Sequence, residues 1–378
     1  MKSVVIVGYA RSPFTPAKKG ELATVRPDEL VAQVVRQLVA RTGVDPHDLE
    51  DLILGCAFPE GEQGLNLARL VGLLAGLPQS VAGQTINRFC GSSMQAVHAA
   101  AGAIQMGAGD AFVCAGVESM TRVPMMGYNP MPHPGLSRDL PGAYMGMGDT
   151  AENVARQWGV ARADQERFAA ESHRRAAQAR TEGRLDDELV SIEAPGRAVV
   201  TDGCIRPETT AAALAELKPA FDQAGSVTAG TSSPLTDGAV ATLVCSEDYA
   251  RAHNLDIMAR IKAISVCGCP PEIMGIGPVG ATGKALARAG LSLADIDVIE
   301  LNEAFAAQSL AVIEELKLDQ EKTNIDGGAI ALGHPLGASG ARITAKAAQI
   351  MKREGKKRAL ATMCIGGGQG IATVLEAV

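Results

Sequence analysis

Short apolar runs alternate along this chain with longer segments whose apolar residues recur every three or four positions. Residues 4–7 form an apolar run, and residues 38–58 and 285–305 each read as the end of a helix, a glycine stop, a short loop and an apolar strand. Apolar runs at 111–115 and 359–363 follow Ala-rich helical segments. This alternation of strands and helices predicts an α/β fold in which helices cover both faces of a mixed sheet.

The predicted elements occur twice. Residues 38–58 can be laid on residues 285–305 without a gap, at an offset of 247 positions, and the helix after Gly91 parallels the helix after Gly337. A repeat of this length indicates a duplicated domain rather than a solenoid. The coincident pairs in the ungapped stretch are Ala40/Ala287, Arg41/Arg288, Gly43/Gly290, Asp48/Asp295, Leu54/Leu301, Ala57/Ala304 and Phe58/Phe305.

An insertion interrupts the first copy. Gly116 matches Gly366 at an offset of 250, whereas Gly238 matches Gly370 at an offset of 132, so the difference of 118 positions measures the insertion. Its Met- and Pro-rich loops and its Arg-rich helical stretch predict a lid or binding domain. The predicted division is a first half at 1–117 with 236–256, an inserted loop domain at 118–235 and a second half at 257–378.

Composition narrows the class of protein. With 378 residues, 47% hydrophobic and 20% charged, the chain is long and apolar enough for two or three core-bearing units. A net charge of −7 argues against a nucleic-acid or anionic-membrane surface. Eight cysteines without regular spacing indicate no disulfide framework, and the opening directly into the apolar run 4–7 indicates no signal peptide, so a reducing cytosol fits best. No apolar run reaches the roughly 18 residues that membrane insertion needs.

Cys90 is the first candidate for chemistry, because it stands between a predicted buried strand and an Ala-rich helical run. A thiol in the first turn of a helix meets the positive end of the helix dipole and unpaired backbone N–H groups, and both favour the thiolate. The same N–H groups could hold an oxyanion. Taken alone, Cys90 fits a buried structural cysteine better, since free cysteine behaves as a small apolar residue.

Three further segments change that balance, because each places one reactive group among glycines or after an apolar strand. His334 lies in the Gly-rich segment 327–340, Cys364 precedes the glycine run 366–368, and Asn302 follows an apolar strand. Singly, these residues fit a loop histidine, a strand-end cysteine and a helix N-cap. Their joint occurrence favours one active site.

Together the four segments resemble the thiolase family over essentially the whole chain. The runs 87–94 and 362–370 are most similar to degradative 3-ketoacyl-CoA thiolases, which are acetyl-CoA C-acyltransferases. The resemblance implies a duplicated thiolase fold: two mixed-sheet halves in a five-layered α-β-α-β-α arrangement, with an inserted loop domain that binds CoA. It also implies an acyl-thioester intermediate.

The resemblance implies a role for each candidate. Cys90 attacks C3 of a 3-ketoacyl-CoA with His334 as its base or ion-pair partner, and Cys364 protonates the departing enolate and later deprotonates CoA. Backbone N–H groups of Cys90 and Gly366 form one oxyanion hole, and His334 with a water held by Asn302 forms the other. Neither a metal nor a permanently bound cofactor is needed, and coenzyme A is a co-substrate.

Binding residues are carried over in the same way. Arg206 matches a family arginine near the nucleotide, Ser233 matches a serine near pantetheine, and Met147 and Phe305 are expected at the CoA and substrate site. Short-chain biosynthetic thiolases carry a histidine where this chain has Gly146, so a roomier pocket and medium- or long-chain substrates are expected. The loop at 128–141 is short, which favours a homodimer over a tetramer. A β-oxidation enzyme is a possible docking partner.

Other interpretations are weighed against this one. Residues 275–280 spell a dinucleotide-binding fingerprint, but Pro270 and Pro271 stand where its strand should run and Pro278 falls in its turn. Rival functions are a short-chain acetyl-CoA C-acetyltransferase, a condensing enzyme of the ketoacyl synthase type, and an inactive acyl-CoA-binding subunit. The second reactive cysteine and the intact set of four residues argue against the last two.

Overall fold

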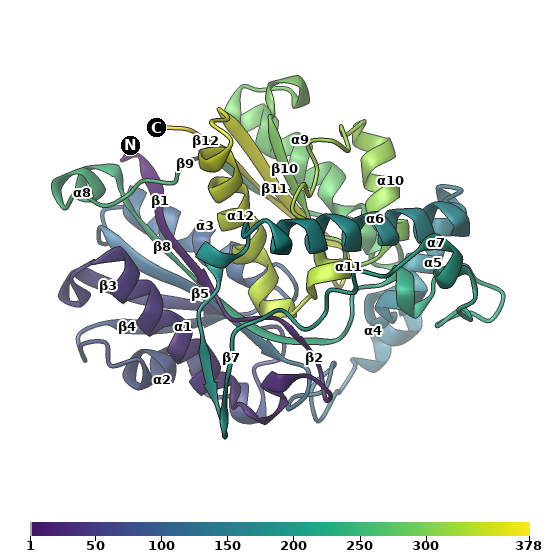
Figure 1. The fold of residues 1–378 in the computed structure, drawn as a ribbon, viewed down its shortest axis with the longest axis horizontal. Helices are drawn as coiled ribbons and strands as arrows, with labels where there is room; N and C mark the ends of the chain where they lie inside the picture. The colour runs from purple at the N-terminus through teal and green to yellow at the C-terminus, as the bar shows by residue number, and fades with distance from the viewer. Residues whose placement is uncertain (1) are drawn as a thin grey trace.

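The computed structural model describes residues 2–378, and a single ten-stranded sheet forms their frame. The strands lie in the order β10-β11-β12-β9-β1-β8-β5-β3-β4, and β2 pairs with β8 outside that path (Figure 1). The strands are β1 Val4–Arg11, β2 Thr15–Pro16, β3 Leu49–Gly55, β4 Ala82–Ile86, β5 Ala111–Ser119, β8 Thr236–Ser246, β9 Ala259–Gly268, β10 Val298–Leu301, β11 Arg358–Ile365 and β12 Gln369–Glu376.

The predicted duplication is visible in the strand order. β3-β5-β8-β1 in the first half is repeated as β10-β11-β12-β9 in the second, and in each half the first pair is parallel and the next two are antiparallel. The resemblance implies two mixed-sheet halves. The structure joins them through a two-residue antiparallel ladder, in which Val5 faces Arg260 and Ile6 faces Ala259.

Strand register corrects the length of the insertion. Leu54 faces Ala115 in the first half, and Leu301 faces Thr362 in the second, so β5 and β11 correspond at the offset of 247. On the next strand of each half, Ala241 faces Ala115 and Ala372 faces Thr362, so β8 and β12 correspond at an offset of 131. The inserted segment is therefore 116 residues long, the difference between 247 and 131. The match of Gly116 with Gly366 is wrong, because Gly366 lies in the hairpin beyond the end of β11.

Helices form three layers around the two halves of the sheet, which confirms the five-layered α/β arrangement. One core lies under α1 and α2, a second lies between the halves around α3 and α12, and a third lies under α9 and α10. Gly43 and Gly290 end α1 and α9 with φ near 69° and 68°, as the glycine stops predict. These helices span Pro27–Thr42 (α1), Leu67–Leu74 (α2), Ser92–Gln105 (α3), Gly277–Ala289 (α9), Ala306–Leu316 (α10) and Leu336–Arg353 (α12).

The inserted segment contributes a further set of short elements and one long helix. Figure 1 shows α6 crossing beside α11 and α10 of the second half, and apolar residues of α6 pack against both. The elements are α4 Pro134–Asp139, α5 Met147–Gln157, α6 Arg162–Thr181, β6 Ile192–Ala194, β7 Arg197–Val199 and α7 Ala211–Ala215; α8 Glu247–Ala252 and α11 Ala329–Leu332 lie outside the insertion.

The first turns of α3 and α12 touch strand ends with no side chain between them. A Cβ on Gly55 would lie 2.3 Å from the backbone nitrogen of Ser93, and one on Gly337 would lie 2.4 Å from the carbonyl oxygen of Val117. Both helices therefore begin where β3, β5 and their counterparts end, and polar residues from both halves meet there. Glycine is required at these two positions because the backbones touch.

The described residues 2–378 contain no helix long and apolar enough to cross a membrane. Over the same residues, no cluster of three or more His, Cys, Asp or Glu side chains could hold a metal ion.

Candidate active site

Cys90 lies at the junction between β4 and α3, in a tight and strained turn. The sequence predicts that Cys90 stands in the first turn of a helix. This is wrong, because α3 begins at Ser92 with Gly91 as its N-cap, so Cys90 precedes the helix. Phe89 has a φ of 42°, which is unfavourable for a residue with a Cβ. The Ser92 hydroxyl supports this turn, because it donates to the carbonyl of Phe89 at 2.6 Å and accepts from the N–H of Arg88 at 2.8 Å.

Burial dominates the electrostatics of the Cys90 thiol. Cys90 is 8% exposed, and burial raises its pKa to about 11, while the backbone N–H groups of Gly366 and of Cys90 itself oppose that rise. The helix start alone does not produce a thiolate, so Cys90 needs a base. The Gly366 N–H is close enough to hydrogen-bond the sulfur, which places this predicted oxyanion-hole donor beside the nucleophile.

His334 is buried and has the features of a neutral base. Its Nδ1 lies 2.6 Å from the Ser339 hydroxyl, which donates its own hydrogen to the carbonyl of Pro335 at 2.9 Å. We assign the proton of His334 to Nδ1 on this network, which leaves Nε2 unprotonated and able to accept a hydrogen bond or a proton. Burial, and then the charge of Arg342, lower the pKa of His334 to about 3, so the resting imidazole is uncharged.

Asn302 follows β10 and reaches the free face of His334. Its Nδ2 lies 3.4 Å from His334 Nε2, and its own N–H donates to the carbonyl of Thr362 at 3.1 Å. Asn302 is fully buried, and its Oδ1 has no hydrogen-bond partner among the described residues, so it can hold a water or a substrate group. The alternative N-cap role is wrong, because α10 begins at Ala306 and its N-cap is Phe305.

Cys364 is the last residue but one of β11 and lies in an apolar cluster beside Cys90. Burial raises its pKa well above the ordinary value, and the thiols of Cys90 and Cys269 raise it further. Phe305 belongs to the same apolar cluster, and Met147 packs against it. Met147 also approaches Gly366, since a Cβ there would lie 3.4 Å from the methionine sulfur. The structure therefore brings together both cysteines, Gly366, Met147 and Phe305.

The two predicted CoA contacts occupy different places. Ser233 donates from its N–H and its hydroxyl to the carbonyl of Ala304, at 3.0 Å each, so it stands beside the segment that carries Asn302 and Phe305. Arg206 is exposed; its N–H donates to Nδ1 of His173 on α6 at 3.1 Å. The hydrogen bonds of Arg206 among the described residues do not reach the group around Cys364.

Sequence reasoning misses the residues that hold the catalytic segments in place. The buried carboxylate of Glu118 accepts from the N–H groups of Ala57 at 2.8 Å, Phe58 at 3.2 Å and Gly337 at 2.8 Å, and burial raises its pKa. The hydroxyl of Thr236 accepts from the N–H of His334 at 3.0 Å. These contacts cross 60 or more residues of chain, so local patterns carry no signal for them.

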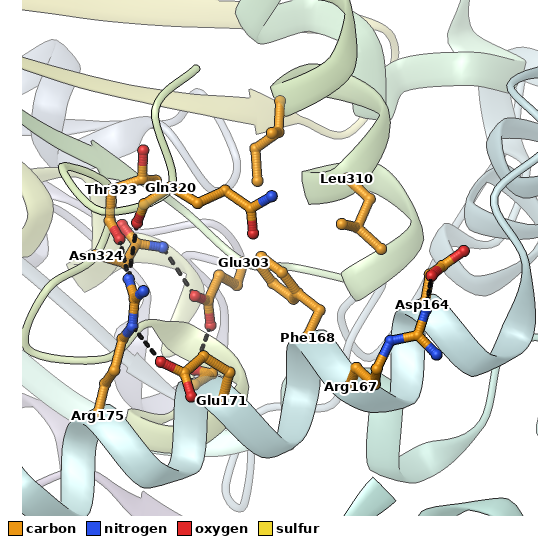
Figure 2. A pocket seen from close by; sticks show the side chains of 12 residues that line it. Asp164, Arg167, Phe168, Glu171, Arg175, Glu303, Leu310, Gln320, Thr323 and Asn324 are labelled. Carbon is orange, nitrogen blue, oxygen red and sulfur yellow. Dashed lines mark hydrogen bonds and ion pairs between the residues drawn. The ribbon is translucent and has the colours of Figure 1, made fainter. Parts of the chain in front are cut away.

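A separate pocket of about 300 Å³ lies between α6, α10 and the loop before Asn324 (Figure 2). The Glu303 side chain lines this pocket and accepts from Ser172 at 2.6 Å and Asn324 at 2.8 Å. Its lining lacks the four candidate residues, so it is distinct from the active site. The lining residues are Asp164, Arg167, Phe168, Glu171, Ser172, Arg175, Glu303, Leu310, Ile313, Gln320, Thr323 and Asn324.

Comparisons with known proteins agree with this geometry. The thiolase N-terminal domain model matches residues 4–248 and the thiolase C-terminal domain model matches 255–377. The chain is 48% identical over 389 residues to a 3-ketoacyl-CoA thiolase of Bacillus subtilis, and 52% identical over 388 residues to one of Shewanella frigidimarina; 100% of each chain is covered in both cases.

Solved structures are similar over the same length. Human mitochondrial 3-ketoacyl-CoA thiolase in complex with CoA has a TM-score of 0.92 at 38% identity, covering 100% of this chain and 98% of that one. An acetyl-CoA acetyltransferase of Bacillus anthracis has a TM-score of 0.91 at 41% identity, covering 100% and 99%. Two matching domain models and relatives of about half-identical sequence show that this chain belongs to the thiolase family.

Proposed function

We propose that this protein is a 3-ketoacyl-CoA thiolase, which cleaves a 3-ketoacyl-CoA with CoA into acetyl-CoA and an acyl-CoA two carbons shorter. The observation that carries the proposal is the meeting of two buried thiols from opposite halves, Cys90 and Cys364, beside the N–H of Gly366. The neutral His334 supplies the base that both reaction directions need. The full-length relatives that bear this name support the substrate class.

In the proposed first step the proton of the Cys90 thiol moves to His334 Nε2, and the sulfur attacks C3 of the substrate. The N–H groups of Cys90 and Gly366 hold the oxyanion that forms on that carbonyl. The C2–C3 bond then breaks, which leaves an acyl thioester on Cys90 and the enolate of acetyl-CoA.

In the proposed second step Cys364 gives its proton to C2 of the enolate, so that acetyl-CoA leaves. The enolate oxygen is held by His334 and by a water on the free Oδ1 of Asn302. The Cys364 thiolate next takes the proton of incoming CoA, whose sulfur attacks the thioester. The departing Cys90 sulfur takes back the proton held on His334 Nε2, which restores both groups to their starting states. Because Cys364 is buried among apolar side chains, its thiol holds its proton until a strong base forms beside it.

The binding assignments remain proposals of the same kind. CoA would run along the inserted loop domain at 118–235, between the halves at 1–117 with 236–256 and at 257–378, past Ser233 and Met147 toward the thiols. Arg206 would meet a phosphate at the mouth, since a guanidinium matches phosphate geometry. Phe305, which Phe221 meets edge to face at 6.0 Å, would pack against pantetheine or the acyl chain.

The chain-length proposal is medium or long, because Gly146 stands where short-chain enzymes carry a histidine. The alternative is a short-chain acetyl-CoA C-acetyltransferase, and the likeness to the Bacillus anthracis acetyl-CoA acetyltransferase favours it. Both would act in fatty-acid metabolism in the cytoplasm, the longer-chain enzyme in β-oxidation.

We also propose a homodimer that meets through the edge strand β4. That edge has no neighbouring strand among the described residues, and the helix and loops beside it expose Leu65, Leu73 and Leu74 at 89%, 45% and 45%. Docking to another β-oxidation enzyme is the weaker alternative. A monomer or a stable tetramer in light scattering would contradict the dimer.

The deciding experiment is CoA-dependent loss of 3-ketoacyl-CoA at short, medium and long chain lengths, for wild type, Cys90→Ser and Cys364→Ser. Loss of activity in both variants, with an acyl adduct on Cys90 of the wild type, is the expected result. Turnover that survives Cys90→Ser contradicts the mechanism. A sharp preference for acetoacetyl-CoA would select the short-chain alternative.

A further inference from the structure

Fully buried charges line one face of α12, and the first of them lies close to His334. Arg342 is 1% exposed and stands three residues after Ser339, so the two side chains share one face of the helix. Its Nη1 lies 3.5 Å from Oε2 of Glu300, which is fully buried on β10, two residues before Asn302. This pair therefore links the helix that orients His334 to the strand that carries Asn302.

The Glu300–Arg342 pair is incompletely satisfied. Within residues 2–378, neither oxygen of Glu300, nor Nε and Nη2 of Arg342, nor the hydroxyl of Tyr9 has a hydrogen-bond partner. One turn further along α12 the pairing is tighter, with Lys346 at 2.9 Å from Glu188 and 3.0 Å from Asp326. A buried ion pair this loose lacks the extra hydrogen bonds that normally hold its charges, so its net charge can change.

Arg342 acts on only one partner of the proposed proton transfer. Its charge lowers the pKa of His334, whereas the charged group that acts on the Cys90 thiol is Glu118. Any change in the net charge of the Glu300–Arg342 pair therefore falls on the imidazole, and it alters how readily His334 accepts a proton from Cys90.

We propose that Glu300 and Arg342 are positioning residues for the Cys90–His334 proton transfer: the charge of Arg342 adds to burial in disfavouring the imidazolium, and the ionised Glu300 carboxylate offsets that charge as the imidazolium forms. The proposal rests on the proposed function. The proton moves from Cys90 Sγ to His334 Nε2, and no other bond changes in this step.

Glu300 is the member of this charge cluster that titrates in an accessible range. Burial raises its pKa to about 8, although Arg342 and Lys346 lower it. The neighbouring groups keep their states: the pKa of Tyr9 is raised well above 10, and Glu188 and Asp326 have lowered pKa values despite burial. Two of the remaining charged neighbours are held by close partners, Arg11 by Asp202 and Glu188, and Lys346 by Glu188 and Asp326. Glu303 accepts hydrogen bonds from Ser172 and Asn324, and burial raises its pKa.

The sign of the effect follows from that titration. Below pH 8 Glu300 binds a proton, so Arg342 opposes the imidazolium alone; above pH 8 the carboxylate offsets it. Wild type and Glu300→Gln should therefore behave alike at low pH and diverge at high pH. Arg342→Met leaves Glu300 without its cation, so the acid stays neutral and the imidazolium is unopposed at every pH.

The test is the rate at which iodoacetamide alkylates Cys90 between pH 6.5 and 9, with the modified peptide quantified by mass spectrometry. We expect the ratio of wild type to Glu300→Gln to rise from about one at pH 6.5 to about ten at pH 9, one pKa unit of coupling. Arg342→Met should be about tenfold faster than wild type at pH 6.5 and equal to it at pH 9. The double variant should match Arg342→Met.

Two controls separate the outcomes. Lys352→Met removes an exposed charge 10 residues further along α12, about 15 Å away, and should change the rate less than twofold. If Glu300→Gln and Arg342→Met both slow alkylation at every pH, or neither changes it, the inference is overturned. If His334→Ala leaves alkylation unchanged, the proposed role of His334 fails instead. Should a single variant fail to fold, the double variant, which leaves no unpaired charge, still tests the pH profile against wild type.

Discussion

The two halves of the molecule place different residue types on the same structural positions. Strand register equates Asn302 with Gly55 and Cys364 with Val117. In the first half these positions serve packing, since Gly55 lets β3 touch the start of α3 and Val117 is buried in the core under α1 and α2. In the second half the same positions carry the amide and the thiol of the proposed site. The duplicated frame thus supplies one set of positions for packing and a matching set for chemistry, while Cys90 is the first half's own contribution.

The largest expected effect concerns Cys364 and Val117. Cys364→Ala should lower kcat for thiolysis by about a thousandfold, because the enolate loses its proposed proton donor. Val117→Ala, at the matching position, should cost about 1–3 kcal/mol of unfolding free energy and leave kcat within about twofold. Steady-state kinetics with denaturant unfolding would measure both. Equal losses of activity would contradict the division between packing and chemistry.

The next largest effect is expected when the residue of the first half is placed at the matching position of the second half. Asn302→Gly installs the residue found at Gly55, and should lower kcat by about a hundredfold because the enolate loses its water-holding amide. KM should change little, since the water acts on the transition state. Thiolysis kinetics on the purified variant check this. An unchanged kcat would mean that Asn302 only packs against His334.

A smaller effect is expected at two serines in the first turns of the central helices α3 and α12. Ser339→Ala removes the acceptor that fixes the tautomer of His334, and should cost about tenfold in kcat. Ser93→Ala removes a 2.8 Å hydrogen bond to the N–H of Ala341, and should cost about 1 kcal/mol of stability with activity nearly unchanged. Comparing kcat and thermal unfolding of the two variants is the measurement. A larger loss of kcat in Ser93→Ala would reverse the assignment.

The smallest expected effect is a gain in stability. Gly102 of α3 corresponds to Ala348 of α12, and a Cβ on Gly102 would find no described atom within 4 Å. Gly102→Ala should therefore raise the unfolding free energy by about 0.5–1 kcal/mol, because it removes backbone freedom from the unfolded chain. Gly337→Ala is the matched opposite, since its Cβ meets three backbone atoms within 2.8 Å. Thermal denaturation would measure both, and destabilisation by Gly102→Ala would show a contact beyond those of this chain.

Much of this arrangement could be predicted from sequence, and the failures share one cause. Apolar runs and glycine stops predict the layers and the duplication because they are local, and the four segments identify Cys90, Asn302, His334 and Cys364. Strand register is not a local property: the sequence pattern pairs Gly116 with Gly366 because both are glycines, whereas the strand pairing equates Gly116 with Met363. The same limit hides Glu118 and Ser339, whose importance lies in what they contact, and Arg342, whose charge reaches His334 only in the folded chain.

The joining of the two half-sheets also bears on how the chain could be rearranged. Val5 of β1 faces Arg260 of β9, and Arg260 faces Glu376 of β12, so the first and last strands flank one strand (Figure 1). Two strand spacings are about 10 Å, which a linker of a few residues spans. A circular permutant that joins these ends and opens between α8 and β9 would keep every strand pairing. Its gene would then encode the second half before the first.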